Sequence, residues 1–266
     1  MKTTLTSAWV RNGTAPIPLL LVFTAAATLL CSNGHAQTVD LGTAGNFGVL
    51  SATGITNTGA TTINGDVGAF PTSSITGFGT VTLNGTNQGG NTISQVAQND
   101  LTTAYNTAAG LVPTTTYSPV MDLGGLTLTA GVYNDPSSLA ITGTLVLNGQ
   151  GNSNAVFVFQ AGSTLTTASN ATIILENGAQ ASNVFWQVGS SATLGTSTDF
   201  SGNILANTSV TLTTGATVLG SVLAENGAVT LDSNTITAAA VPEPDSAVLF
   251  CLGALVLLRR KRPAQA

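Results

Sequence analysis

The stretch Ala192-Thr193-Leu194-Gly195-Thr196-Ser197-Thr198 returns twice, with small changes, further along the chain. The later copies are Val210-Thr211-Leu212-Thr213-Thr214-Gly215-Ala216-Thr217 and Val229-Thr230-Leu231-Asp232-Ser233-Asn234-Thr235. The leucines of the three copies lie 18 and 19 residues apart. A period of about 20 residues with short apolar runs is typical of a β-solenoid, in which each coil of strands stacks on its neighbour.

An earlier segment, residues 163–170, fits the same pattern after a longer insertion. Because side chains alternate along a strand, we expect the leucines to point inward and the preceding threonines to point outward. The inward column is Leu165, Leu194, Leu212 and Leu231, and the outward column is Thr164, Thr193, Thr211 and Thr230. A further outward column is Thr167, Thr196, Thr214 and Ser233, followed by Asn170, Thr198, Thr217 and Thr235. The alternative is that these threonines only reflect the β-propensity of a solvated face.

Charged residues are scarce and unevenly placed in this chain of 266 residues. They make up 6% of the sequence, against about 25% in ordinary soluble domains, whereas 43% of the residues are apolar. Every Lys and Arg lies near one of the two ends: Lys2, Arg11, Arg259, Arg260, Lys261 and Arg262. Residues 37–240 contain no Lys, Arg, His or Cys. This composition excludes nucleic acid as a partner, Cys or His metal sites, Ser-His triads and cysteine nucleophiles.

The acidic residues of the same stretch are scattered, with no Asp-x-Asp cluster that would suit calcium. They are Asp40, Asp66, Asp100, Asp122, Asp135, Glu176, Asp199, Glu225 and Asp232. A glycosidase needs two carboxylates about 5 to 9 Å apart, and a lyase would need a basic residue that this stretch lacks. The sequence therefore predicts a protein that is not an enzyme and has no cofactor, metal or catalytic residue.

The first 36 residues have the pattern of a secretory signal peptide. Lys2 and Arg11 precede an apolar run from residue 17 to 30, and Gly34-His35-Ala36 favours cleavage before Gln37. The alternatives are a transmembrane helix, for which the run is short, and a lipoprotein signal that ends at Cys31.

The C-terminal segment, residues 241–266, has Pro242-Glu243-Pro244, then an apolar helix over residues 247–258 and then a basic cluster. With these three parts in this order it resembles the PEP-CTERM sorting signal of Gram-negative bacteria. The resemblance implies processing by an exosortase, transient membrane association through the apolar helix, and delivery to the cell surface or extracellular matrix. A permanent membrane anchor is the alternative, although the apolar run is short for one.

One segment departs from the strand pattern. Between residues 93 and 109 the apolar side chains recur at helical spacing, which predicts an α-helix with one apolar stripe. Thr92 and Gln95 would form a capping box, and Gly110 with Pro113 would end the helix. We expect the stripe to lie along the solenoid, and an interface between two copies is the alternative.

Five segments between residues 39 and 237 have a characteristic sequence: residues 41–47, 61–68, 126–133, 154–160 and 183–193. In these segments the chain is similar to the ice-binding β-solenoid domain family of bacteria and fungi. The resemblance implies an all-β fold, which is a right-handed, irregular β-solenoid of triangular section with one long helix packed alongside. We take residues 37–240 as this domain.

Some members of that family carry Thr-Ala/Gly-x-Thr/Asn motifs on the face that binds ice. Here the pattern occurs at residues 53–56, 58–61, 167–170 and 214–217, whereas residues 196–199 depart from it. The resemblance therefore implies an ice-binding face with Thr53, Thr56, Thr167, Asn170, Thr196, Thr198, Thr214 and Thr217. The column of Thr164, Thr193, Thr211 and Thr230 is the second candidate face.

We expect a secreted monomer that adsorbs to ice through a flat threonine-rich face and inhibits ice growth or recrystallisation. Its partners would be ice with its ordered water and an exosortase. The alternative is a cell-surface protein of the exopolysaccharide matrix that serves adhesion or structure and has no ice activity.

Overall fold

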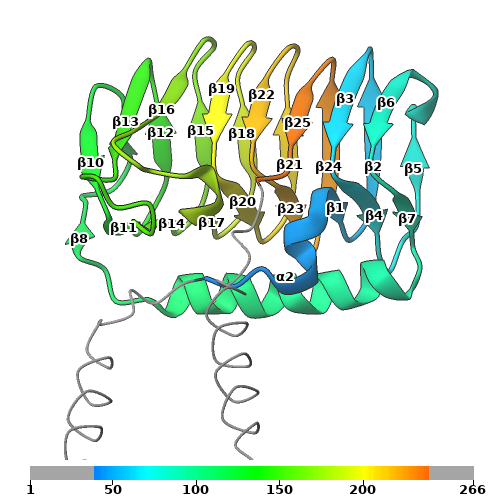
Figure 1. Cartoon of the computed structure of the whole chain (residues 1–266), viewed down its shortest axis with the longest axis horizontal. Coiled ribbons are helices and arrows are strands. Elements are labelled where there is room, and N and C mark those ends of the chain that lie inside the picture. Colours follow the sequence, from blue (N-terminus) through cyan, green and yellow to red (C-terminus); the bar gives the residue numbers. More distant parts are fainter. Residues whose placement is uncertain (1–38, 240–266) are drawn as a thin grey trace, which may run out of the picture. The chain divides into compact units, whose positions relative to one another are not determined.

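The computed structural model describes residues 39–239, which form three parallel β-sheets wound as successive coils, with one α-helix alongside (Figure 1). Each complete coil contributes one strand to each of the three sheets, which we name A, B and C in the order in which the chain visits them. All the strand pairs are parallel. This confirms the expected irregular β-solenoid with a helix packed alongside, whereas its right-handed winding stays a prediction.

The three sheets have these strands, in spatial order. Sheet A has β7 (Asn87–Gly89), β4 (Asp66–Ala69), β1 (Phe47–Ser51), β23 (Val222–Ala224), β20 (Asn203–Ala206), β17 (Val184–Val188), β14 (Phe157–Ala161), β11 (Gly131–Asp135) and β8 (Thr115–Thr116). Sheet B has β5 (Ile75–Thr76), β2 (Gly54–Thr58), β24 (Ala228–Asp232), β21 (Val210–Leu212), β18 (Ala192–Leu194), β15 (Leu165–Thr167), β12 (Leu139–Ile141) and β9 (Met121–Asp122). Sheet C has β10 (Thr127–Thr129), β13 (Thr144–Asn148), β16 (Thr172–Glu176), β19 (Asp199–Ser201), β22 (Thr217–Leu219), β25 (Thr235–Thr237), β3 (Thr61–Asn64) and β6 (Val81–Asn84).

The coils do not stack in sequence order. The coil of β1, β2 and β3 lies between the coil that follows it in the chain and the last coil, since β1 pairs with both β4 and β23. The chain can reach the far end of the solenoid because α2 (Thr92–Gly110) runs from β7 at one end of sheet A to β8 at the other (Figure 1). The final coil then returns to close against the first, as β25 pairs with β3.

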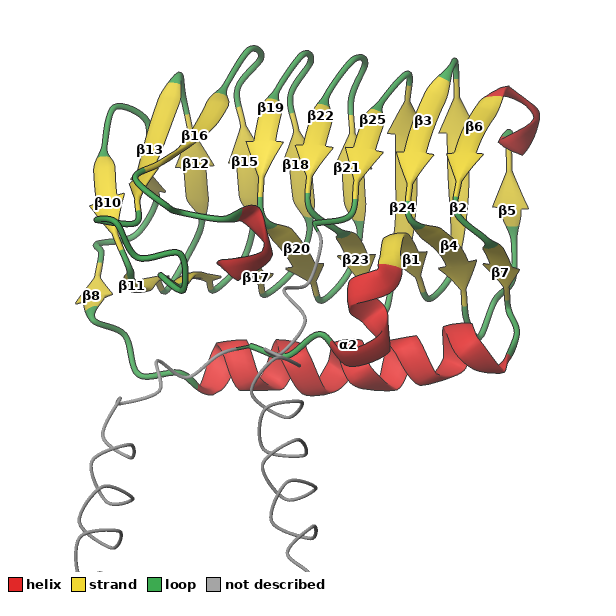
Figure 2. Cartoon of the chain, viewed as in Figure 1, coloured by secondary structure: helices red, strands yellow, loops and turns green. Residues whose placement is uncertain are grey.

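The helix covers the outer surface of sheet A (Figure 2). Its buried face includes Ala97, Leu101, Ala104 and Ala108, which pack against outward side chains of the sheet such as Phe185. This confirms the predicted helix and its packing along the solenoid. The expected stripe was too wide, because Ile93 and Val96 are 48% and 42% exposed.

The start of this helix differs from the expected capping box. The cap is Asn91, whose side-chain oxygen accepts hydrogen bonds from the backbone N–H groups of Ile93 and Ser94. An asparagine at this position satisfies two of the N–H groups that the first turn leaves free.

Of the three short 3₁₀ helices, η1 (Gly42–Asn46) contacts α2, η2 (Phe78–Thr80) precedes β6 and η3 (Ala181–Asn183) precedes β17.

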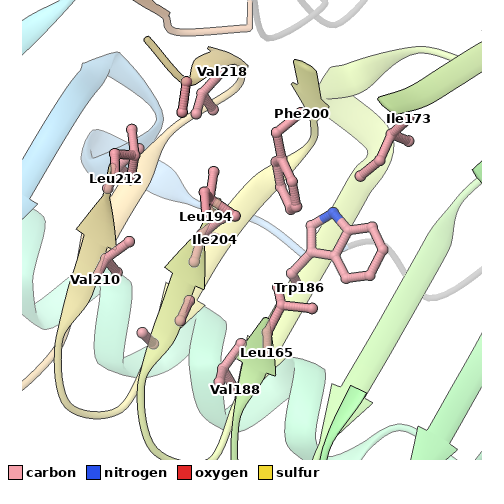
Figure 3. Packing of buried hydrophobic residues seen from close by; sticks show 14 of the residues in the cluster. Leu165, Ile173, Trp186, Val188, Leu194, Phe200, Ile204, Val210, Leu212 and Val218 are labelled. Atoms are coloured by element: carbon pink, nitrogen blue, oxygen red, sulfur yellow. The ribbon is translucent and has the colours of Figure 1, made fainter. Parts of the chain in front are cut away.

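The interior between the three sheets is filled by apolar side chains from every coil. Figure 3 shows part of this cluster, between Leu165 and Val218. Aromatic rings form a stack inside sheet A, where Phe159 and Trp186 have ring centroids 3.9 Å apart. The Trp186 indole N–H donates to the carbonyl of Ser201 at 3.1 Å, so the polar atom of this buried ring has a partner. Such a core excludes water and fixes the outer surfaces of sheets B and C.

The predicted inward leucines are all buried, but they do not make one column. Leu165 pairs with Ala192, and Thr167 therefore takes the inward position of Leu194 and Leu212 in the neighbouring coils. The alignment of the repeats was wrong by two residues in this coil, because it matched leucine to leucine.

Within residues 39–239 no helix is both long and apolar enough to cross a bilayer.

Candidate functional site

Sheet B presents an unbroken row of threonines on its outer surface. The pairing of neighbouring strands aligns one threonine from each of six adjacent strands. We call this row the threonine column: Thr166, Thr193, Thr211, Thr230, Thr56 and Thr76. Five of its members are exposed and Thr211 is half-buried. At a strand spacing of about 4.8 Å, the column extends roughly 24 Å along the solenoid.

The positions beside the threonine column are mostly occupied by small residues. Because side chains two residues apart share one face of a strand, the residues two before and two after each threonine also point outward. Those before are Thr164, Ser191, Ser209, Ala228, Gly54 and Ser74. Those after are Ala168, Gly195, Thr213, Asp232 and Thr58. Beyond Thr76 the strand has ended, and Phe78 lies in η2 and packs against the core. With Asp232 at one border, the surface beside the column has little relief and one carboxylate.

Sheet C also has aligned threonines, but its surface is uneven. The column Thr144, Thr172, Asp199, Thr217, Thr235, Thr62 and Thr82 is interrupted by an acidic residue. In the neighbouring column Ile174 is 39% and Leu219 is 45% exposed, so bulky side chains rise above the threonines. Sheet A is covered by α2. Of the three sheets, sheet B alone offers a long, flat and nearly neutral surface.

The first predicted set of site residues does not lie on one face. Thr167 and Thr198 are 3% and 1% exposed, so their assignment to an outer surface was wrong. Their hydroxyls lie 2.7 Å apart inside the solenoid, and Thr167 also accepts from the backbone N–H of Gly195 at 2.9 Å. The two hydroxyls are tolerated in the core because they satisfy each other.

The remaining members of that set lie at several places. Thr56 belongs to the threonine column, and Thr53 lies at the turn between sheets A and B. Asn170, Thr196 and Thr214 lie in the turns between sheets B and C. These turns contain residues with positive φ, such as Gly215 at 75°, a conformation that glycine adopts without a steric penalty.

Carboxylates accept hydrogen bonds from both threonines of the Thr-Gly-Ala-Thr motif at residues 214–217. The Thr214 hydroxyl donates to Asp232 at 2.5 Å, and the Thr217 hydroxyl donates to Asp199 at 2.8 Å. Thr217 itself belongs to sheet C. The turn around residues 214–217 is therefore flanked by two charges, and its hydroxyl protons are already engaged.

Three of the four residues in the second predicted set, Thr193, Thr211 and Thr230, lie in the threonine column. Thr164 was misplaced, since it precedes the column by two residues and its hydroxyl bonds that of Ser138 at 2.9 Å. Thr166 and Thr76 were missed. The signal for both was present, because each follows an apolar residue that aligns with Ala192 and Val210, as in Leu165-Thr166 and Ile75-Thr76.

A chain of buried polar groups runs beneath the edge between sheets B and C. Asn234, which is 1% exposed, donates to the carbonyls of Thr213 and Ala216 and accepts from the N–H of Asp232. In the next coil the Thr61 hydroxyl donates to Asn57 at 2.6 Å and accepts from the backbone N–H of Asn234. These bonds link successive turns across the stack, and they hold the edge that borders sheet B in a fixed position.

The electrostatics of the described residues give no sign of a reactive centre. No group of three or more His, Cys, Asp or Glu side chains in residues 39–239 is placed to hold a metal ion. At the end of sheet B, partial burial acts to raise the pKa of Asp122, but the backbone N–H groups of Gly124 and Thr142 outweigh it and the pKa is lowered. Asp122 is thus an ordinary ionised carboxylate near neutral pH.

Comparisons with known proteins identify the family of this chain. The family described as Ice-binding-like matches residues 49–237, and the PEP-CTERM protein-sorting motif matches residues 240–262. An ice-binding protein of Nostoc sp. (strain HG1) is 48% identical over 228 residues, which are 82% of this chain and 84% of the relative. An ice-binding protein of Flavobacterium frigoris (strain PS1) is 38% identical over 75% of this chain and 76% of the relative.

Solved structures give the same result. The crystal structure of an ice-binding protein from the Antarctic ascomycete Antarctomyces psychrotrophicus aligns with a TM-score of 0.73 and 43% identity, and the match covers 77% of this chain and all of that one. The family match covers well over half of the sequence, and the three-sheet solenoid is shared. The chain therefore belongs to the ice-binding-like family.

Proposed function

We propose that this protein binds ice through the outer surface of sheet B and thereby inhibits the growth or recrystallisation of ice. The observation that carries the proposal is the threonine column, which continues without a break over six strands. The names of the relatives support ice as the partner. The choice of sheet B follows from the geometry of this chain.

The chemistry of threonine suits an ice surface. Each hydroxyl can hydrogen-bond one or more waters, whereas each methyl group limits how strongly the adjacent water is oriented. The backbone of each strand is held by its neighbours on either side, so the hydroxyls keep a regular spacing before any contact with ice. Little conformational freedom is then lost on adsorption, and this raises the affinity of the surface.

The near absence of charge on sheet B also supports this sheet as the surface that binds ice. Charged side chains hold their hydration water tightly, and their desolvation would oppose a fit to neutral ice. The charges that border the site, Asp122 and Asp232, lie at an end and at an edge of the sheet. We propose that the protein acts as a monomer and by adsorption alone, without catalysis, a metal or a cofactor.

The sorting motif supports a site that acts outside the cytoplasm. The PEP-CTERM match indicates export. We propose that residues 1–36 are removed as a signal peptide, that an exosortase processes residues 241–266, and that the domain acts at the surface or in the matrix of a Gram-negative cell. These terminal segments lie outside the described residues.

Paired substitutions on two faces test this proposal. Thr193→Tyr places an aromatic ring in the middle of the threonine column, and Thr235→Tyr places the same ring at an exposed position of sheet C. Both are surface changes, so we expect each purified domain to melt within about 2 °C of wild type. Inhibition of ice recrystallisation should be lost in Thr193→Tyr and kept in Thr235→Tyr.

Two results would contradict the proposal. An inactive wild-type domain would remove ice as the partner, and binding to exopolysaccharide instead would move the function to adhesion in the matrix. A loss of activity in Thr235→Tyr with full activity in Thr193→Tyr would transfer the site to sheet C.

A further inference from the structure

The described chain ends at the edge between sheets C and A. β25 is its last strand and belongs to sheet C. The next residue, Ala238, donates its backbone N–H to the carbonyl of Asn64 at 2.9 Å and packs against Gly65, where the first coil turns from β3 in sheet C to β4 in sheet A. The C-terminal segment therefore begins at this edge.

This edge is the part of the solenoid farthest from sheet B. In a three-sided coil, the edge between two faces lies opposite the third face, and here that face carries the threonine column. The start of the described chain also lies away from sheet B, because Val39 and Leu41 are buried in the cluster between α2 and sheet A. Neither end of the described chain emerges on sheet B.

The sorting motif follows the fold without a spacer. β25 ends at Thr237 and the motif match begins at residue 240. The apolar run of this segment begins at residue 247, and the ten residues that lead to it from Thr237 span about 35 Å at most when fully extended. Whatever retains the C-terminal segment must therefore hold the edge between sheets C and A within about that distance.

The charge of the domain opposes its lying flat on a cell envelope. Residues 39–239 contain nine acidic residues and no basic one. Anionic lipid or polysaccharide repels such a domain within about 8 Å at physiological ionic strength. Retention would thus come from the C-terminal segment alone, and sheet B would stay free.

From this geometry we infer a cell-bound function: while the protein is joined to its retained C-terminal segment, it presents sheet B away from the cell and attaches the cell to ice. The inference rests on the proposed function of sheet B. It adds a partner on the opposite side, the envelope of the cell, and a biological task other than limiting crystal growth in solution. Tethering many copies on one cell would also make attachment multivalent, which strengthens it without any new contact.

The experiment measures the retention of whole cells on an ice surface. Cells with the matching export and sorting machinery produce the full chain, the full chain with Thr193→Tyr, the full chain with Thr235→Tyr, or a chain that ends at Ala239. We expect retention with wild type and with Thr235→Tyr. Thr193→Tyr should reduce retention to the level of non-producing cells. The truncated chain should do the same and should transfer the ice activity to the medium.

A circular permutant tests the orientation itself. Its new ends lie between Thr196 and Ser197 in the exposed turn between sheets B and C, its old ends are joined by a flexible linker, and residues 240–266 follow the new C-terminus. The permutant without residues 240–266 should keep its activity in solution, which shows that it folds. With them, the protein should reach the surface but cell retention should be lost, because sheet B now lies beside the envelope.

Failure of this inference can be told apart from failure of the proposed function. An active purified domain, together with producing cells that stay at background while all active protein is in the medium, would overturn the cell-bound function alone. Unchanged retention in the permutant that carries residues 240–266 would overturn the orientation. An inactive purified wild-type domain would instead overturn the proposed function of sheet B.

Discussion

Replacement of Asn234 by alanine should destabilise the fold by an amount that its hydrogen bonds predict. The buried amide donates to the carbonyls of Thr213 and Ala216 at 2.9 and 3.1 Å, and its oxygen accepts from the N–H of Asp232 at 2.6 Å. Both carbonyls keep a second bond, from the N–H groups of Ala216 and Thr235. The substitution therefore leaves one buried donor, the Asp232 N–H, without this partner and removes one of two bonds from each carbonyl.

These losses can be summed. An orphaned buried donor costs about 1–3 kcal/mol, and each lost secondary bond about 0.5–1 kcal/mol, which gives about 3 kcal/mol in total. For a domain of this size, 1 kcal/mol corresponds to about 2–4 °C, so the melting temperature should fall by roughly 6–12 °C. Asn226→Ala is the matched control. Like Asn234, Asn226 lies two residues after the end of a strand, but it is exposed, and within the described residues its side chain makes no hydrogen bond. A fall of less than about 2 °C in Asn234→Ala would refute the structural role of the buried polar chain.

Three further predictions concern the core, the acidic pH range and metal ions. Trp186→Ala removes a fully buried ring that stacks on Phe159, and calorimetry should show a loss of about 3–5 kcal/mol, whereas a loss under 1 kcal/mol would contradict the packing. Because its folded pKa is lowered, Asp122 stabilises the fold above the carboxyl's unfolded pKa of about 3.9, and this contribution disappears as the pH falls through the folded value. Asp122→Asn should therefore lessen the acid sensitivity seen in unfolding curves below pH 4, and an unchanged pH profile would count against the two N–H bonds. Chelator and reductant should leave the melting curve of residues 37–239 unchanged, and a shift with either would reveal a metal or disulfide dependence.

The repeat pattern predicted the solenoid because parallel coils reuse the same strand chemistry. Alternation along each strand gave the burial of Leu194, Leu212 and Leu231, and helical spacing gave α2. Register was harder to predict. A threonine fills the inward position at Thr167, where the adjacent coils have Ile141 and Leu194, because a second buried hydroxyl at Thr198 pairs with it. Sequence similarity alone cannot show such compensation between two coils.

The order of the coils could not be predicted from the repeats. The pairing of β1 with β23 joins segments more than 170 residues apart, and it arises because α2 carries the chain along the whole of sheet A. This arrangement extends the threonine column. Thr230 belongs to the last coil and pairs with Thr56 of the first coil, which in turn pairs with Thr76 of the second coil. The row therefore continues from the last coil into the first two. A site that depends on this closure is visible only in three dimensions.

Labelling at single cysteines can show whether sheet B is the surface that binds ice. Residues 37–240 contain no cysteine, so Thr211→Cys on sheet B, Thr235→Cys on sheet C and Asn99→Cys on α2 each create one reactive site. Thermal hysteresis is measured for each purified domain before and after attachment of a bulky maleimide, so every protein is its own control. We expect the label to abolish hysteresis at Thr211→Cys and to leave it intact at the other two positions. Full hysteresis with the label on sheet B, and loss of it with the label on sheet C or α2, would contradict the claim.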